Sequence, residues 1–175
     1  MSIEKIKASA ERYQKAIDNI NTKRQLWNTT TEQFIFDTLV SIKNEVKLDW
    51  AVRKVERMRN LESVELSFND TMSGISEGGV ALMKTYKKMG GKLIFTQSYS
   101  GEVLVLCVLP FIQELTPPAQ PELLDRADPD DIDATFITKH IPTFIEKLAK
   151  WEGSDEQHRS APIGFNRRTE AEETK

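Results

Sequence analysis

The chain has 175 residues, of which 39% are hydrophobic and 29% are charged, and its net charge is −3. This length and composition fit an ordinary soluble protein with one substantial core. So small a net charge gives no indication of a polyanionic or polycationic partner. The single cysteine, Cys107, excludes a disulfide framework within the chain, which indicates a reducing compartment. No apolar run approaches the ~20 residues that span a bilayer, so we expect a cytoplasmic protein that enters no membrane.

Residues 3–27 are predicted to form a long amphipathic helix, because apolar side chains return every three or four residues in a seven-residue repeat. The repeat weakens at Ala10 and Arg24. Such a narrow apolar seam needs a partner helix, since helices draw most of their stability from packing. The candidate residues for self-association are therefore Ile3, Ile6, Tyr13, Ile17, Ile20 and Trp27.

A second helix is predicted over residues 31–46. The segment 28–31 reads Asn-Thr-Thr-Thr, all residues that favour helix N-caps, and Gln33 follows Thr30 at the spacing of a capping box. We expect the two helices to form a helical hairpin over residues 1–47, or to meet a second subunit.

Residues 48–109 are predicted to form a sheet. Alternating side chains indicate strands over 49–58 and 62–69, and two further strands, 92–99 and 102–109, are joined by a tight turn. The last of these is apolar on both faces, so we expect it to be covered on both sides at the centre of the core. Between the two strand pairs we expect a flexible loop over 73–79 and a short helix over 80–89, closed by Gly90 and Gly91.

Three prolines predict an extended loop over residues 113–127. A helix then begins at Asp128, with Pro129 in its first turn, and Pro142 is expected to kink or split it. The polar residues 153–175 are predicted to be a flexible tail, whose apolar island at 162–165 is either disordered polymer or a docking arm.

These elements predict an α+β fold in which an antiparallel sheet of about four strands is covered by helices, with an N-terminal helical hairpin and a C-terminal helix. Residues 1–152 are expected to form one domain. Residues 1–60 carry 12 Lys and Arg against 8 Asp and Glu, whereas residues 110–152 carry 4 against 9. We expect these basic and acidic regions to lie near one another in the fold or in an oligomer.

Candidate ligand-binding residues are few. If residues 49–59 form a strand, three arginines share one face and could hold an anion or single-stranded nucleic acid; the alternative is a solvated face paired with Glu62 and Glu65. His140 lies at the edge of the last helix's apolar stripe, as a structural histidine or a general base. The candidate set is Arg53, Arg57, Arg59, Tyr99 and His140.

No pattern indicates a cofactor, a metal or a known catalytic constellation. The acidic cluster around Asp128 lacks the glycine and glutamate of a calcium loop, and Cys107, His140 and His158 are not at zinc-ligand spacing. We therefore expect a non-enzymatic, self-associating interaction module, most simply a homodimer. The alternative is a small-molecule or anion-binding protein, or an enzyme, with a pocket between sheet and helices. A third hypothesis is nucleic-acid binding through residues 43–59.

Overall fold

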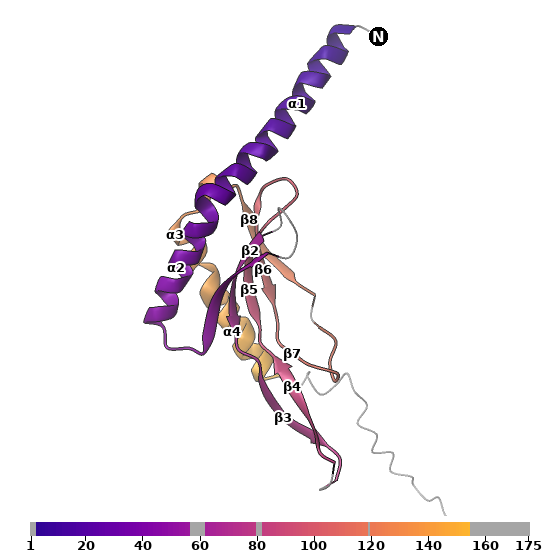
Figure 1. Cartoon of the computed structure of the whole chain (residues 1–175), viewed down its shortest axis with the longest axis vertical. Coiled ribbons are helices and arrows are strands. Elements are labelled where there is room, and N and C mark those ends of the chain that lie inside the picture. Colours follow the sequence, from indigo (N-terminus) through magenta and orange to yellow (C-terminus); the bar gives the residue numbers. More distant parts are fainter. Residues whose placement is uncertain (1–2, 57–61, 80–81, 119, 155–175) are drawn as a thin grey trace, which may run out of the picture.

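The computed structural model describes residues 3–56, 62–79, 82–118 and 120–154. The fold is α+β, as predicted: a long N-terminal helical segment, a five-stranded antiparallel sheet, a smaller three-stranded sheet and a C-terminal helix (Figure 1). The predicted flexible tail, apart from residues 153–154, lies outside the described residues and stays a prediction.

The N-terminal segment is one continuous helical rod, so the predicted hairpin is wrong. Helix α1 (Ile3–Leu26) runs through a π-helical segment, η1 (Trp27–Thr31), directly into α2 (Glu32–Glu45). The threonines of the junction do not cap a new helix; the hydroxyls of Thr29 and Thr31 donate back to the carbonyls of Gln25 and Leu26. Because the hydroxyls find acceptors inside the rod, nothing forces a turn there.

The five-stranded sheet has the order β1-β2-β5-β6-β8 and contains every strand that the sequence predicted. Its strands are β1 (Trp50–Glu56), β2 (Glu62–Phe68), β5 (Lys92–Gln97), β6 (Val103–Val108) and β8 (Glu122–Ala127). One face forms the core with α2 and the C-terminal helix; its fully buried side chains are Val64, Leu66, Leu93, Phe95, Val103, Val105 and Cys107. The other face is only partly covered, since Leu104, Leu106 and Val108 are half-buried, so the expectation of full cover on both sides of β6 is wrong.

The three-stranded sheet replaces the predicted loop over 73–79 and the predicted helix over 80–89. It has the order β3-β4-β7, from β3 (Thr71–Glu77), β4 (Lys84–Met89) and β7 (Phe111–Ile112). In β4 only Tyr86 is buried, and its hydroxyl donates to Glu77. Figure 1 shows β3 and β4 reaching away from the body at the end opposite α1. These strands lie outside the main core, so their side chains lack the apolar alternation that burial imposes.

The C-terminal region is more ordered than the sequence predicted. The expected loop over 113–127 contains β8, which pairs with the edge of β6. The last helix is split as Pro142 predicts, into α3 (Ala134–Thr138) and α4 (His140–Glu152), with Pro142 in the first turn of α4, where its missing N–H costs nothing. Asp133, rather than Asp128, caps α3 by accepting from the Phe136 N–H at 2.6 Å. A short 3-10 turn, η2 (Pro129–Asp131), precedes it.

Candidate functional site

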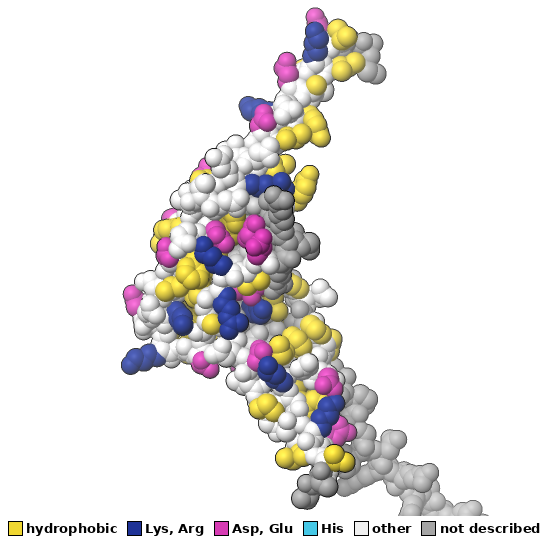
Figure 2. Space-filling view, in the orientation of Figure 1, with side chains coloured by type: hydrophobic (Ala, Val, Ile, Leu, Met, Phe, Trp, Pro, Cys, Tyr) yellow, Lys and Arg dark blue, Asp and Glu magenta, His cyan; other side chains and the backbone are white. Residues whose placement is uncertain are grey.

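The N-terminal part of α1 stands clear of the rest of the described chain. All its residues from 3 to 16 are exposed, and the side chains of Ile3, Ile6 and Tyr13 are 68%, 56% and 70% exposed. Figure 1 shows this part of the helix projecting from the body, and Figure 2 shows hydrophobic side chains along one side of it. We call this stripe the α1 seam; it consists of Ile3, Ile6, Ala10, Tyr13, Ile17 and Ile20.

The C-terminal end of α1 is fastened to the body by charged contacts. Lys23 forms an ion pair with Asp128, the residue before η2, and this hydrogen bond raises the pKa of Lys23. The Arg24 guanidinium donates to the Tyr99 carbonyl at 2.9 Å and lies 5.3 Å from the centroid of the Tyr99 ring. The Lys23–Asp128 pair joins the basic N-terminal region to the acidic C-terminal region. They hold α1 at one end only, so its direction is set while its seam stays exposed.

Trp27 does not belong to the exposed seam, and its predicted role in self-association is wrong. It is fully buried in the chain's own core, in the same cluster as Ile35 and Leu39 of α2. The heptad repeat therefore passes from solvent into the core: Ile3, Ile6 and Tyr13 are exposed, Ile17 and Ile20 are half-buried, and Trp27 is fully buried.

The structure does not bring the predicted ligand-binding residues together. Arg57 and Arg59 lie outside the described residues. Arg53 is exposed on β1, an edge strand, and is the ladder partner of Glu65, as the solvated-face interpretation expects. Its neighbour Lys54 is bound to Glu32 and Gln33 of α2. The described cations of this segment thus have acidic or amide neighbours, which weakens the case for an anion site.

Tyr99 and His140 occupy unrelated places. Tyr99 lies in the turn between β5 and β6 and is 81% exposed. His140 is buried between aromatic rings, 6.4 Å from Phe95 and 5.1 Å from Phe136 by ring centroids. Burial and the nearby Lys139 lower the pKa of His140, so its ring is neutral at pH 7. Its surroundings fit a structural histidine rather than a general base that a substrate can reach.

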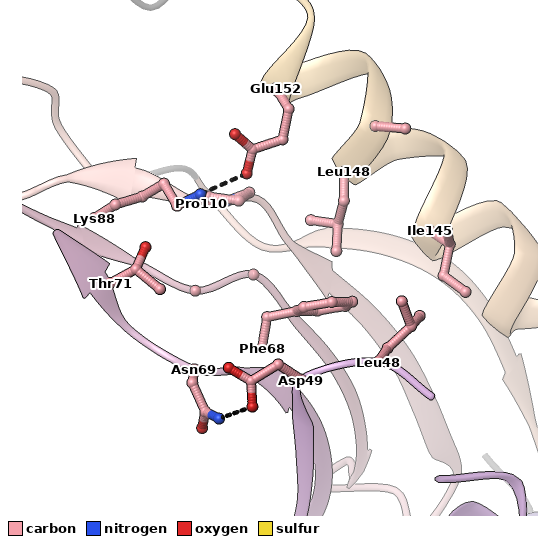
Figure 3. A pocket seen from close by; sticks show the side chains of 13 residues that line it. Leu48, Asp49, Phe68, Asn69, Thr71, Lys88, Pro110, Ile145, Leu148 and Glu152 are labelled. Atoms are coloured by element: carbon pink, nitrogen blue, oxygen red, sulfur yellow. Dashed lines mark hydrogen bonds and ion pairs between the residues drawn. The ribbon is translucent and has the colours of Figure 1, made fainter. Parts of the chain in front are cut away.

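A groove of about 310 Å³ lies between α4 and the junction of β2 with β3, and none of the residues that line it was among the predicted site residues. Its floor is apolar, and in Figure 3 Leu148 of α4 points toward Phe68 of β2. The polar side chains pair with each other: Asn69 donates to Asp49 at 2.6 Å, and Lys88 bonds Glu152 at 2.7 Å. Because these groups satisfy one another, the groove offers an apolar surface rather than an ionic one.

The glycine pair before β5 was the only sequence signal of this groove. The prediction that Gly90 and Gly91 end a helix is wrong. A Cβ added at Gly91 would lie 2.4 Å from Cδ2 of Leu148, and one at Gly90 would lie 2.0 Å from the Phe68 carbonyl oxygen. The glycines are there because α4 and β2 approach the backbone closely.

Comparisons of the chain with known protein families, curated proteins and solved structures give no match. In the described parts of the chain, no three His, Cys, Asp or Glu side chains gather where they could hold a metal ion. None of the described helices combines the length and apolar character needed to cross a bilayer. Function is therefore inferred from the exposed surfaces, of which the α1 seam is the most distinctive.

Proposed function

We propose that this chain is a non-enzymatic interaction module that self-associates through the α1 seam. The observation that carries the proposal is that a helix with an apolar stripe projects from the body with no part of the described chain packed against its first four turns. Helices draw most of their stability from packing of an apolar face, and residues 3–16 have no such packing within the described chain, so a projecting helix with a seven-residue repeat is best explained by a second helix that covers it.

The seam is small, which sets the expected affinity. Burying an isoleucine contributes about 1.5–3 kcal/mol, whereas association costs roughly 4–15 kcal/mol in lost freedom of motion. Each copy buries six seam positions, one of them only an alanine, so the net free energy of association is modestly favourable. We therefore expect a dimer with a dissociation constant on the order of micromolar rather than nanomolar.

The test compares two variants in the same turns of α1. Ile6→Gln with Tyr13→Gln removes one isoleucine and the only tyrosine of the seam. Lys5→Gln with Arg12→Gln changes the residues just before them, on the outer face. Glutamine is a good helix former, so both variants keep the helix. Sedimentation velocity over a concentration series from about 0.1 to 100 µM brackets the expected midpoint.

We expect dimers of the unchanged chain and of the outer-face variant, and monomers of the seam variant. A monomeric unchanged chain at 100 µM, about a hundred times the expected midpoint, would exclude the proposal. Equal dimerisation of all three proteins would place the interface elsewhere on the surface.

The groove beside α4 supports a second candidate function, the binding of an apolar ligand. Its apolar floor and internally paired rim favour a hydrophobic group over an anion. The test is binding of a fluorescent naphthalene dye. Ala149→Trp fills the groove from α4 and should abolish the signal, whereas Lys150→Trp, which is not among the residues that line the groove, should leave it unchanged. Equal signals from both variants would exclude this groove as the dye site.

A further inference from the structure

We infer that the second copy lies antiparallel on the α1 seam, with Ile3, Ile6 and Ala10 of one copy facing Ile20, Ile17 and Tyr13 of the other. This inference depends on the proposed self-association and names its geometry. It follows from where the body closes the seam, from the sizes of the seam side chains and from the charges beside them.

The turn between β5 and β6 covers the C-terminal end of the seam. Arg24 occupies the next seam position after Ile20 and is held by the Tyr99 carbonyl in the turn between β5 and β6. Gly101 of the same turn lies so close that an added Cβ would be 2.7 Å from Cβ of Lys23 and 3.3 Å from the Ile20 carbonyl oxygen. The turn thus sits over the seam side of α1. A helix that packs on the seam must end before Lys23.

A parallel pair conflicts with this turn. In a parallel, symmetric pair each seam residue meets its own copy, so the two turns would be pressed together at the same end. Arg24 would face Arg24, a like-charge contact at a seam position. Two alanines would also meet at position 10, which leaves a void, and two tyrosines would meet at position 13, which overfills the seam.

An antiparallel pair resolves each of these conflicts. The two bodies lie at opposite ends, and each β5–β6 turn meets only the N-terminal end of the other helix. Reversal brings the smallest seam residue, Ala10, opposite the largest, Tyr13, so that the total volume of each layer is nearly constant. The isoleucines pair among themselves as Ile3 with Ile20 and Ile6 with Ile17. Two equal patches related by a two-fold axis form a closed dimer.

The charges beside the seam agree with the antiparallel direction. On the flank that contains positions 4, 7, 11, 14, 18 and 21, Lys7 of one copy lies level with Ala16 of the other, so Asp18 is two residues, or about 3 Å along the axis, away and within reach of the Lys7 side chain; the symmetric contact repeats this pair. On the same flank Glu11 meets the neutral Gln14. At the positions next to the seam, a parallel pair brings neutral Ser9 and Ala16 beside Gln14 and Asn21, and so gains no opposite-charge contact there.

The experiment uses disulfide cross-linking in the full-length protein. The native Cys107 is buried in the core and does not compete for mild oxidation. Separate chains carrying Ile6→Cys and Ile17→Cys are oxidised alone and as an equimolar mixture, in which about half of the dimers combine one copy of each. A mixture of Ala10→Cys and Ile20→Cys chains, offset from the proposed pairing by one heptad, is the matched control.

We expect the cross-linked dimer in the Ile6→Cys and Ile17→Cys mixture, at least about ten times above either chain alone and above the control mixture. Cross-linking of the Ile6→Cys chain by itself would show a parallel pair, and cross-linking of the control mixture would show a shifted register. A dimer that forms no cross-link in any sample also overturns the pairing. Each of these results leaves self-association standing, whereas a monomer in sedimentation removes both proposals.

Discussion

Substitutions of Trp27 test which residues of the heptad repeat pack in the chain's own core and which are left to contact a partner. Its side chain is fully buried in the core, and its indole N–H has no hydrogen-bond partner among the described residues. Trp27→Ala should therefore cost about 3–5 kcal/mol of unfolding free energy. Trp27→Phe keeps an aromatic ring and removes an unpaired donor, so it should cost markedly less.

The measurement is thermal unfolding followed by circular dichroism, at a concentration where the chain is monomeric. For a protein of this size, the alanine change should lower the midpoint by roughly 6–20 °C. Tyr13→Ala, an exposed position on the same repeat, should change unfolding of the monomer by no more than about 0.5 kcal/mol. If Trp27→Ala abolishes dimers but leaves monomer unfolding unchanged, Trp27 belongs to the interface and this division of the repeat is wrong.

Two further predictions concern a close approach and a titration. Gly101 and Gly74 both have a positive φ, of +86° and +78°, but only at Gly101 would a new Cβ meet Lys23. In urea unfolding, Gly101→Ala should therefore lower the unfolding free energy by about 1–3 kcal/mol, and by more than Gly74→Ala does. Equal losses would show that the turn does not press on α1. Burial, followed by the Lys139 charge, lowers the pKa of His140 below 6.5. The unfolded chain then binds a proton that the folded chain does not, so the unfolding free energy falls as the pH drops below about 6.5. His140→Gln should flatten this part of the profile, and an unchanged profile would contradict it.

The strands of the main core were predictable because burial imposed a period on the sequence. In β6 the residues facing the helices, Val103, Val105 and Cys107, are fully buried, and β2 repeats the pattern with Val64 and Leu66. In sequence, β2 alternates apolar and polar residues, and β6 is a short unbroken apolar run that begins after a turn and ends before Pro110; both patterns favour a strand, so the element type and the approximate bounds followed.

The peripheral strands were not predictable in the same way. In β4, Lys84–Met89, Tyr86 is the only buried side chain, and β8 contains no fully buried residue. These strands are defined by backbone pairing with β3 and with the edge of β6, which is a property of the neighbours rather than of their own side chains. The three prolines before β8 favoured the wrong prediction of a loop there, and Gly74 of β3 with Gly78 and Gly79 just after it favoured a loop over 73–79.

The junction of α1 and α2 shows how local signals can be overridden by the core. Three threonines after an asparagine favour a helix start in isolation. In the structure Trp27 and Thr31, four residues apart on one face of the π-helical turn, are both buried, and the Thr31 hydroxyl lies 3.3 Å from the Pro129 carbonyl oxygen. Burial of the Trp27 side chain stabilises the continuous rod by more than a capping box would. The core that surrounds this side chain is built largely from the sheet and the C-terminal helices, which lie far along the chain.

In the α1 seam, too, the local sequence does not show what packs against it, so its partner has to be inferred from the shape of the surrounding structure. A seven-residue repeat shows that a helix has an apolar side, but it cannot distinguish residues covered by the chain itself from residues covered by another molecule. Gly101 and Tyr99 make that distinction, because their turn closes the seam at Lys23 and Arg24. Once that end is closed, a second copy can avoid the turn only by running the other way. In the proposed dimer, the direction of the pairing thus depends on a loop that lies outside the repeat.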